Sequence, residues 1–310
     1  SPNFQFLAYS RPSRNPVFPK NRVSKIPKLE INSRKLKDLT MRKLFVFALA
    51  AFILTLSWAT YSNAIVAPSP TNYTDPLIEA HYGDYPAATP LVAIAPKVPV
   101  EGQTVTYGSY DGQSFTGYLA RPQGQTGPLP ALIVIHEWWG LNDNIKAMTD
   151  RLAGEGYTAL AVDLYGGEVA EAPEKAAQLK QAAEDRPQIL EVNLRQAYQY
   201  LEEQQQAPKI ASIGWCFGGT MSFKTALLFP QELDASVIYY GSGIETYPAL
   251  LEPLQMPILG IFGGLDSNPP PEKAAEFQGV LTSLNKSAEI YIYEDANHAF
   301  ANPSDRKSVV

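Results

Sequence analysis

The stretch Ile213-Gly214-Trp215-Cys216-Phe217-Gly218-Gly219 contains the only cysteine of the chain, inside a G-x-C-x-G-G pattern. It follows the apolar run 210–213 and opens a second apolar run, 217–228. A strand that turns abruptly into a helix strains the residue at its tip and brings backbone so close that a Cβ would clash, so glycines are needed there. We therefore predict a nucleophile elbow. Its Cys216 thiol would lie beside the Phe217 N–H and the positive helix end, which favour thiolate and oxyanion alike.

An acid and a histidine follow this cysteine, each just after a predicted strand. The apolar strand 258–262 leads into a turn that ends at Asp266, and the strand 288–293 precedes His298. The chain order nucleophile, acid, histidine is that of the α/β-hydrolase triad, and differs from the chymotrypsin and subtilisin orders. We predict that His298 keeps Cys216 as thiolate and later protonates the leaving alkoxide, while Asp266 fixes the imidazole tautomer.

Alternating apolar strands and helices predict an α/β fold with a mostly parallel central sheet covered by helices on both faces. An antiparallel hairpin at the sheet edge is expected first, through Ser109–Gly112. The expected strands are 104–107, 115–120, 131–135, 158–162, 210–213, 235–239, 258–262 and 288–293. The expected helices are 145–155, 173–183, 188–203, 217–228 and 272–284. All three triad candidates would then lie at the carboxyl ends of strands, where such folds place their sites.

Four stretches resemble the dienelactone hydrolase (carboxymethylenebutenolidase) family, in the same order and with similar spacing. They are Ile135–Asn142, the G-W-C-F-G-G turn, Gly263–Asp266 and Asn297–Phe300, within a similar region from about Thr104 to Asn302. The resemblance implies the α/β-hydrolase fold. It also implies that Glu137 holds the resting thiol until substrate displaces it, and that the N–H groups of Phe217 and of a residue near Trp138 form the oxyanion hole.

One position departs from the family pattern. Dienelactone hydrolases proper hold the free carboxylate of the substrate with arginines, one of them four residues after the catalytic histidine, where this chain has Asn302. An uncharged amide lacks the bidentate, charge-assisted grip of a guanidinium. We expect weaker selectivity for anionic lactones, unless Arg186 or Arg195 supplies the charge.

For several other polar and aromatic residues, a structural role is the simpler interpretation or an equal alternative. His136 ends a buried strand and is expected to brace the loop that follows, and His81 is expected at the surface. Asp163 also closes a strand but precedes the nucleophile, so we predict a structural role. Trp138, Trp139 and Trp215 flank the elbow and the oxyanion loop, where they could be core residues or line an apolar pocket for the acyl group.

Composition and charge indicate one catalytic domain, residues 101–310, behind a targeting segment. The 310-residue chain is 45% hydrophobic, and its net charge is −6. Residues 1–64 carry eleven Lys or Arg and two Asp or Glu, a net of +9, so −15 remains for residues 65–310. Such an acidic part argues against nucleic-acid and anionic membrane partners. We expect a monomer acting on a small molecule.

No phosphate loop, dinucleotide fingerprint or cysteine pair is present, and the three histidines are scattered along the chain. We therefore predict neither a cofactor nor a metal. A lone thiol is a liability in an oxidising compartment, so its retention there would fit a chemical use.

The basic excess belongs to a leader. Met41–Lys43, the uncharged apolar run 44–58 and Ser62–Ala64 have the three-part pattern of a secretory signal peptide, 41–64, with cleavage after Ala64. The run is short for a membrane span of about 20 residues, although an uncleaved anchor is the alternative. We expect a secreted or periplasmic protein, ahead of a cytoplasmic or organellar one.

The remaining segments are interpreted from the same pattern. Residues 1–40 are expected to be upstream sequence or part of a two-stage organellar leader, and 65–100 an extended lead-in. The chain stops twelve residues after His298, where the family adds another helix, so we expect a truncated C-terminus.

These observations together predict a cofactor-independent hydrolase of a carboxylic ester or lactone that works through an acyl-enzyme on Cys216. Two alternatives stay open. One is a broader carboxylesterase or peptidase of the same fold, and the other is a catalytically silent α/β-hydrolase scaffold used for binding.

Overall fold

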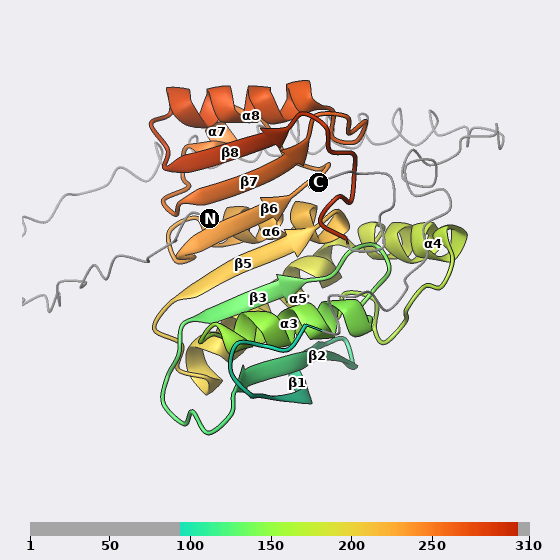
Figure 1. Cartoon of the computed structure of the whole chain (residues 1–310), viewed down its shortest axis with the longest axis vertical. Coiled ribbons are helices and arrows are strands. Elements are labelled where there is room, and N and C mark those ends of the chain that lie inside the picture. Colours follow the sequence, from blue (N-terminus) through green and yellow to red (C-terminus); the bar gives the residue numbers. More distant parts are fainter. Residues whose placement is uncertain (1–93, 303–310) are drawn as a thin grey trace, which may run out of the picture. The chain divides into compact units, whose positions relative to one another are not determined.

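The computed structural model describes residues 94–302 of the chain. In this part, eight strands form one sheet in the order β1-β2-β4-β3-β5-β6-β7-β8 (Figure 1). The pairs β1–β2 and β2–β4 are antiparallel, and all the later neighbours are parallel. The predicted α/β-hydrolase fold, with its edge hairpin and mostly parallel sheet, is therefore confirmed.

The strands are β1 (Val100–Tyr110), β2 (Gln113–Pro122), β3 (Ala131–Ile135), β4 (Thr158–Val162), β5 (Ile210–Trp215), β6 (Ala235–Tyr239), β7 (Ile258–Gly263) and β8 (Ala288–Tyr293). The helices are α3 (Asp143–Gly154), α4 (Pro173–Glu184), α5 (Pro187–Gln199), the π-helical turn η2 (Tyr200–Gln204), α6 (Phe217–Leu228), α7 (Pro248–Leu251) and α8 (Pro271–Ser283).

Local sequence explains where these elements begin. The strands β3 and β4 are continuous apolar runs buried on both faces, as central parallel strands must be. Four of the described helices, α4, α5, α7 and α8, start with proline at the first position, where the missing N–H has no intrahelical acceptor to lose. The Asn142 side chain caps α3 by accepting from the N–H of Ile145 at 3.1 Å.

The structure differs from the predicted elements in small ways. The edge hairpin is longer on both strands, and the helix expected over 188–203 ends in the π-helical turn η2. The short helix α7 was not predicted, because four residues carry too little periodicity to be recognised. These differences leave the strand ends that carry the site candidates where they were expected.

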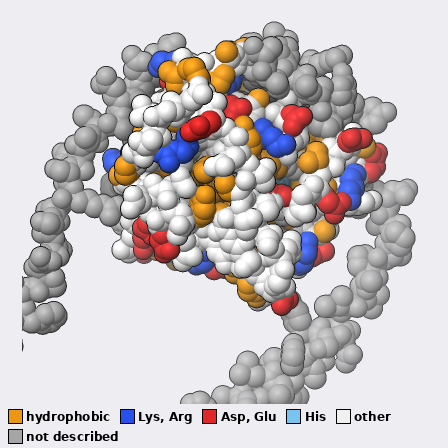
Figure 2. Space-filling model, turned by 90° about the horizontal axis from the view of Figure 1, so that it is seen from below, with side chains coloured by type: hydrophobic (Ala, Val, Ile, Leu, Met, Phe, Trp, Pro, Cys, Tyr) orange, Lys and Arg blue, Asp and Glu red, His pale blue; other side chains and the backbone are white. Residues whose placement is uncertain are grey.

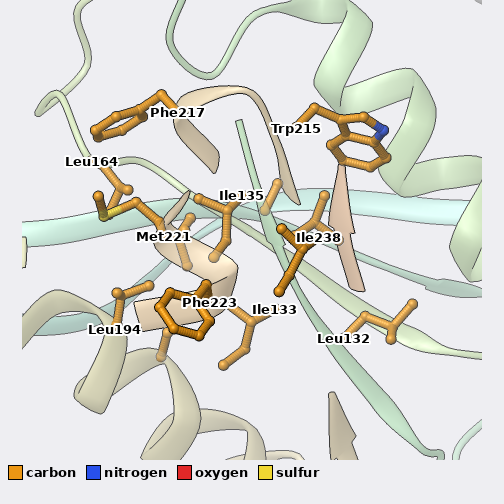
Figure 3. Packing of buried hydrophobic residues seen from close by; sticks show 14 of the residues in the cluster. Leu132, Ile133, Ile135, Leu164, Leu194, Trp215, Phe217, Met221, Phe223 and Ile238 are labelled. Carbon is orange, nitrogen blue, oxygen red and sulfur yellow. The ribbon is translucent and has the colours of Figure 1, made fainter. Parts of the chain in front are cut away.

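The core lies where α6 packs on β5 and β6 behind the sheet, while α3 passes in front (Figure 1). Figure 3 shows Trp215 and Phe217 on opposite sides of Ile135, above a layer that includes Met221, Phe223 and Ile238. Burying each such side chain contributes about 1.5–3 kcal/mol to folding. The residues on either side of Cys216 are thereby fixed in the core.

Several expectations concern residues outside the described part of the chain. They are the upstream segment 1–40, the signal peptide 41–64, most of the lead-in 65–100, His81 and the C-terminal residues 303–310.

Within residues 94–302 no helix has both the length and the apolar character needed to cross a membrane. Figure 2 shows one face of the described part, where Lys and Arg side chains are interspersed with Asp and Glu.

Candidate active site

The predicted nucleophile turn is present between β5 and α6. Cys216 adopts φ 56° and ψ −116°, a strained conformation for a residue other than glycine. Its N–H donates to Tyr239 O at 3.1 Å, which fastens the turn to the end of β6. A Cβ on Gly214 would lie 2.1 Å from Gly218 O, and one on Gly218 would lie 2.3 Å from Ile135 O. Only glycine allows this close approach, as the sequence pattern predicted.

The predicted acid and histidine meet at the same edge of the sheet. Asp266 follows β7 and His298 follows β8, and both side chains are buried. His298 Nδ1 and Asp266 Oδ2 are 2.8 Å apart, while Asp266 Oδ1 accepts from the N–H of Asn268 at 2.7 Å. Because the carboxylate is held through both oxygens, it fixes the imidazole ring and leaves Nε2 for the other partner of the histidine.

That other partner is the cysteine. Burial lowers the pKa of His298, but the charge of the Cys216 thiolate, the hydrogen bonds to Asp266 and Cys216 and the charge of Asp266 together raise it to about 10. A pKa this high favours a protonated imidazole near neutral pH, with Asp266 and Cys216 as its two polar neighbours. Cys216, His298 and Asp266, 82 residues apart at most, form one buried array.

Tyr240 is a site residue that the sequence did not single out. It is buried at the end of β6, with φ 36°, and its ring packs edge to face on His298 with centroids 5.1 Å apart. The same ring contacts Phe300 at 5.3 Å. These aromatic neighbours keep water from the imidazole. The only sequence signal is a tyrosine placed directly after a strand, which is too common to be diagnostic.

Glu137 and Asn302 are joined directly. Asn302 Nδ2 donates to Glu137 Oε2 at 2.9 Å, and both side chains are buried. Glu137 lies on the loop after β3, and Asn302 lies four residues after His298. The sequence placed Glu137 against the thiol and Asn302 in the substrate pocket without linking them. Both of those roles stay predictions.

The three tryptophans all belong to the buried core cluster. Trp138 and Trp139 pack edge to face with centroids 5.1 Å apart, and Trp215 stacks on Tyr239 at 5.6 Å. Trp139 O also accepts from the N–H of Ala170, which ties the loop after β3 to the loop after β4. A core role is thus evident, and a pocket lined by these rings stays a prediction.

The two residues interpreted as structural have structural contacts. Asp163 accepts from the N–H groups of Tyr165, at 2.9 Å, and Gly167, so it closes its own loop. His136 Nδ1 lies 2.5 Å from Glu137 O, and its Nε2 accepts from the N–H of Leu164 at 3.1 Å. The ring therefore braces the loop after β3 against the loop after β4.

Phe217 is the first residue of α6, where backbone N–H groups have no intrahelical acceptor. Its N–H lies next to Cys216 in sequence, at the positive end of the helix dipole. Across the residues that the structure covers, no group of three or more His, Cys, Asp or Glu is placed to hold a metal ion. The side chain of Cys216 thus lies beside backbone donors at the carboxyl ends of the strands.

The family of the chain follows from comparison with known proteins. The model of the "Dienelactone hydrolase family" matches residues 115–310. The chain belongs to the dienelactone hydrolase family. The match contains Cys216, Asp266 and His298, and the resemblance inferred from four short stretches is confirmed.

Relatives and solved structures agree with this membership. A protein of Escherichia coli O157:H7 with the provisional name carboxymethylenebutenolidase is 31% identical over 233 residues, which are 70% of this chain and 85% of that protein. One of Saccharolobus solfataricus with the same provisional name is 32% identical over 63% of this chain and 88% of its own. A crystal structure from Klebsiella pneumoniae, provisionally named dienelactone hydrolase, superimposes with a TM-score of 0.59 and 26% identity, covering 68% of this chain and 92% of its own.

Proposed function

We propose that this dienelactone hydrolase family member hydrolyses a carboxylic ester or lactone through Cys216, His298 and Asp266. One observation carries the proposal: Cys216 is buried beside His298 at the carboxyl ends of the strands, and Asp266 fixes the His298 ring through Nδ1 at 2.8 Å. Family membership supports a hydrolase acting on a small molecule. The activity needs no group beyond these side chains, the nearby backbone and water.

In the first half of the reaction the Cys216 thiolate adds to the acyl carbon, and the carbonyl electron pair moves onto oxygen. The N–H groups of Phe217 and Trp138 would stabilise that oxyanion. The tetrahedral intermediate then collapses as the bond to the leaving oxygen breaks. His298 gives its Nε2 proton to the departing alkoxide, and an acyl thioester remains on Cys216.

In the second half the neutral His298 takes a proton from water, and the resulting hydroxide adds to the thioester carbon. The carbon–sulfur bond breaks, the carboxylic acid leaves and the thiolate is restored beside the imidazolium. Asp266 keeps Nδ1 protonated throughout, so Nε2 is always the nitrogen that exchanges the proton.

The pair Glu137 and Asn302 suggests the charge of the substrate. A neutral amide stands where the family resemblance led us to expect a guanidinium, and it binds a buried carboxylate of the protein. An anionic substrate placed here would meet a like charge in a poorly hydrated environment, which is unfavourable. We therefore expect neutral short-chain or aryl esters to be at least as good substrates as carboxylate-bearing dienelactones.

The test is a hydrolysis assay on the full chain, with p-nitrophenyl acetate and an anionic dienelactone, before and after alkylation by iodoacetamide. We expect turnover that alkylation abolishes, and an acetyl group on the Cys216 peptide when the reaction is quenched and analysed by mass spectrometry. Turnover that survives complete alkylation would rule out the thiol mechanism. A lack of turnover on a broad ester, lactone and peptide panel would favour the silent scaffold.

Export is a separate proposal, and it rests on the pattern of residues 41–64 alone. Expression from Met41 in a bacterium should give an exported protein that starts near Ile65. N-terminal sequencing decides between this outcome and a cytosolic product that retains Arg42 and Lys43.

A further inference from the structure

His136 is a fully buried histidine that the proposed reaction does not use. It follows β3 directly and lies between the loop that carries Glu137 and Trp138 and the loop after β4. Both ring nitrogens are engaged by main-chain atoms: Nδ1 with Glu137 O at 2.5 Å, and Nε2 with the N–H of Leu164 at 3.1 Å.

These two contacts determine the tautomer. A backbone N–H can only donate, so Nε2 must be the bare nitrogen that accepts from Leu164. The ring proton is therefore on Nδ1, and the Nδ1–H group donates a hydrogen bond to Glu137 O. Burial lowers the pKa of His136, although the Glu137 carbonyl and the charge of Asp163 oppose this in part, so the ring is neutral. His136 is thus a fixed donor rather than a proton carrier.

The Glu137 carbonyl that accepts this hydrogen bond belongs to the same peptide group as the Trp138 N–H, the proposed oxyanion donor. Glu137 C=O and Trp138 N–H are the two ends of one planar, trans peptide, so they point in opposite directions. A donor fixed on the oxygen therefore fixes the direction of the N–H. It also draws electron density toward the oxygen and makes the N–H a stronger donor. Gly140 N–H, 3.3 Å from the same oxygen, adds a weaker restraint.

The ring of His136 also contacts the nucleophile turn. It stacks on Phe217 with centroids 5.9 Å apart and meets the edge of Tyr165 at 4.7 Å. On the backbone side, a Cβ on Gly218 would lie 2.5 Å from His136 O. His136 therefore contacts the Glu137 carbonyl on one side and the Phe217 ring and Gly218 on the other.

We propose that His136 is a positioning residue for the oxyanion hole, which aims the Trp138 N–H through the Glu137 carbonyl and sets its spacing from Phe217. The inference rests on the proposed ester hydrolysis. It goes beyond a general bracing role, because it requires the hydrogen bond from Nδ1 and not merely the volume of the ring.

A matched pair of variants tests this requirement. Asn and Leu have nearly the same shape, and both remove the imidazole ring, but His136→Asn can keep a donor near the Nδ1 position while His136→Leu cannot. Near-UV circular dichroism and thermal unfolding establish that each variant is folded. Three readouts follow: kcat and KM on p-nitrophenyl acetate, the inhibition constant of an aryl trifluoromethyl ketone, and the rate of Cys216 alkylation by iodoacetamide.

These readouts distinguish a misplaced oxyanion donor from a general loss of active-site structure. The thiolate adds to the carbonyl of the ketone and produces an oxyanion, whereas alkylation displaces iodide and produces none. Loss of an oxyanion donor costs about 10²–10³ in kcat, so a misaimed donor should cost roughly 10- to 100-fold in kcat and in ketone affinity. We expect this loss in His136→Leu, with KM and the alkylation rate within about threefold of wild type, and partial recovery in His136→Asn.

Several outcomes would overturn the inference. They are a His136→Leu enzyme with kcat and ketone affinity near wild type, a parallel fall in the alkylation rate, or a His136→Asn enzyme no better than His136→Leu. If either variant does not fold, His136→Phe, which keeps an aromatic ring without the donor, is compared with wild type by the same criteria. A wild-type protein without turnover or ketone binding would instead refute the proposed function itself.

Discussion

The two buried histidines of the described region lie close to the same edge of the sheet and have opposite ionisation. His298 faces the Cys216 thiolate and the Asp266 carboxylate, and its pKa is raised to about 10 in spite of burial. His136 faces a peptide carbonyl and a peptide N–H, and burial lowers its pKa. Burial alone therefore accounts for the neutral His136 but not for the raised pKa of His298.

The difference lies in what each ring contacts. Formal charges within hydrogen-bond reach outweigh the cost of desolvating an imidazolium, and peptide dipoles of both polarities do not. The charged histidine can supply a proton to a leaving group. The neutral one can only orient what it touches. The following experiments remove one of the charges beside His298, introduce a charge at Asn302, or titrate His298 itself.

The largest effect should come from removing the thiolate. Cys216→Ala should lower kcat by about 10⁴–10⁶ with the fold intact, since triad nucleophiles contribute that much. It should also lower the pKa of His298 toward its ordinary value and leave His136 unprotonated, because the thiolate is the largest raising influence. NMR titration of the histidine C2 protons measures both rings. Retained turnover, or an unchanged His298 titration, would contradict the array described above.

Removal of the carboxylate charge should have the next largest effect. Asp266→Asn should lower kcat by about 10⁴, because the amide favours the wrong imidazole tautomer. Asp163→Asn is the matched control, since Asp163 is also a buried carboxylate after a strand but its carboxylate accepts from the N–H groups of Tyr165 and Gly167 rather than contacting His298. It should cost stability, about 1–3 kcal/mol for disrupted buried hydrogen bonds, rather than kcat. If Asp266→Asn and Asp163→Asn lowered kcat equally, the proposed difference in role between the two carboxylates would be wrong.

A smaller effect concerns substrate charge. Asn302→Arg should raise the relative kcat/KM for an anionic dienelactone over p-nitrophenyl acetate, by about 10- to 150-fold, because one charge-assisted contact contributes roughly 1.5–3 kcal/mol. Asn302→Gln, which keeps the amide, is the control. Steady-state kinetics on both substrates measure the ratio.

A strong preference of the wild type for the anionic lactone would mean that another arginine already binds its carboxylate. Arg195 is poorly placed for this role. It pairs with Glu191 at 2.9 Å and lies over the Phe229 ring, at the far end of α6 from Cys216. Arg186 donates to Ala182 O at 3.0 Å and would be the residue to substitute first.

The smallest effect should appear on raising the pH. Because the folded pKa of His298 lies above its ordinary value of 6.5, its contribution to stability is complete below that value and is lost as the pH rises through about 10. We expect kcat/KM to fall on the alkaline side with an apparent pKa near 10, together with the unfolding free energy. An alkaline limb near pH 6.5 would contradict the ion pair. Cys216→Ala should show a weaker dependence of stability on pH.

Much of the site was predictable because its determinants are local. The glycines around Cys216 are dictated by contacts within the turn, and the order of Cys216, Asp266 and His298 follows from strands that end at one edge. Local pattern therefore predicted both the fold and which three residues would meet.

Other features depend on contacts between distant segments, which one sequence does not reveal. Asn302 and Glu137 are 165 residues apart, and nothing in either segment indicates that their side chains are bonded. The ring of Tyr240 packs on His298 only because β6 and β8 flank β7 in the sheet. The contact of His136 with the N–H of Leu164 likewise depends on the adjacent ends of β3 and β4.

The close approach of Gly218 to the end of β3 also bears on motion. Backbone atoms of Ile135 and His136 occupy the space that any side chain on Gly218 would need, so the turn at Cys216 and the loop after β3 pack backbone against backbone. We expect the two segments to open as one unit on the timescale of amide hydrogen exchange. In the proposed reaction, the nucleophile and the oxyanion donors would then become exposed and buried again together.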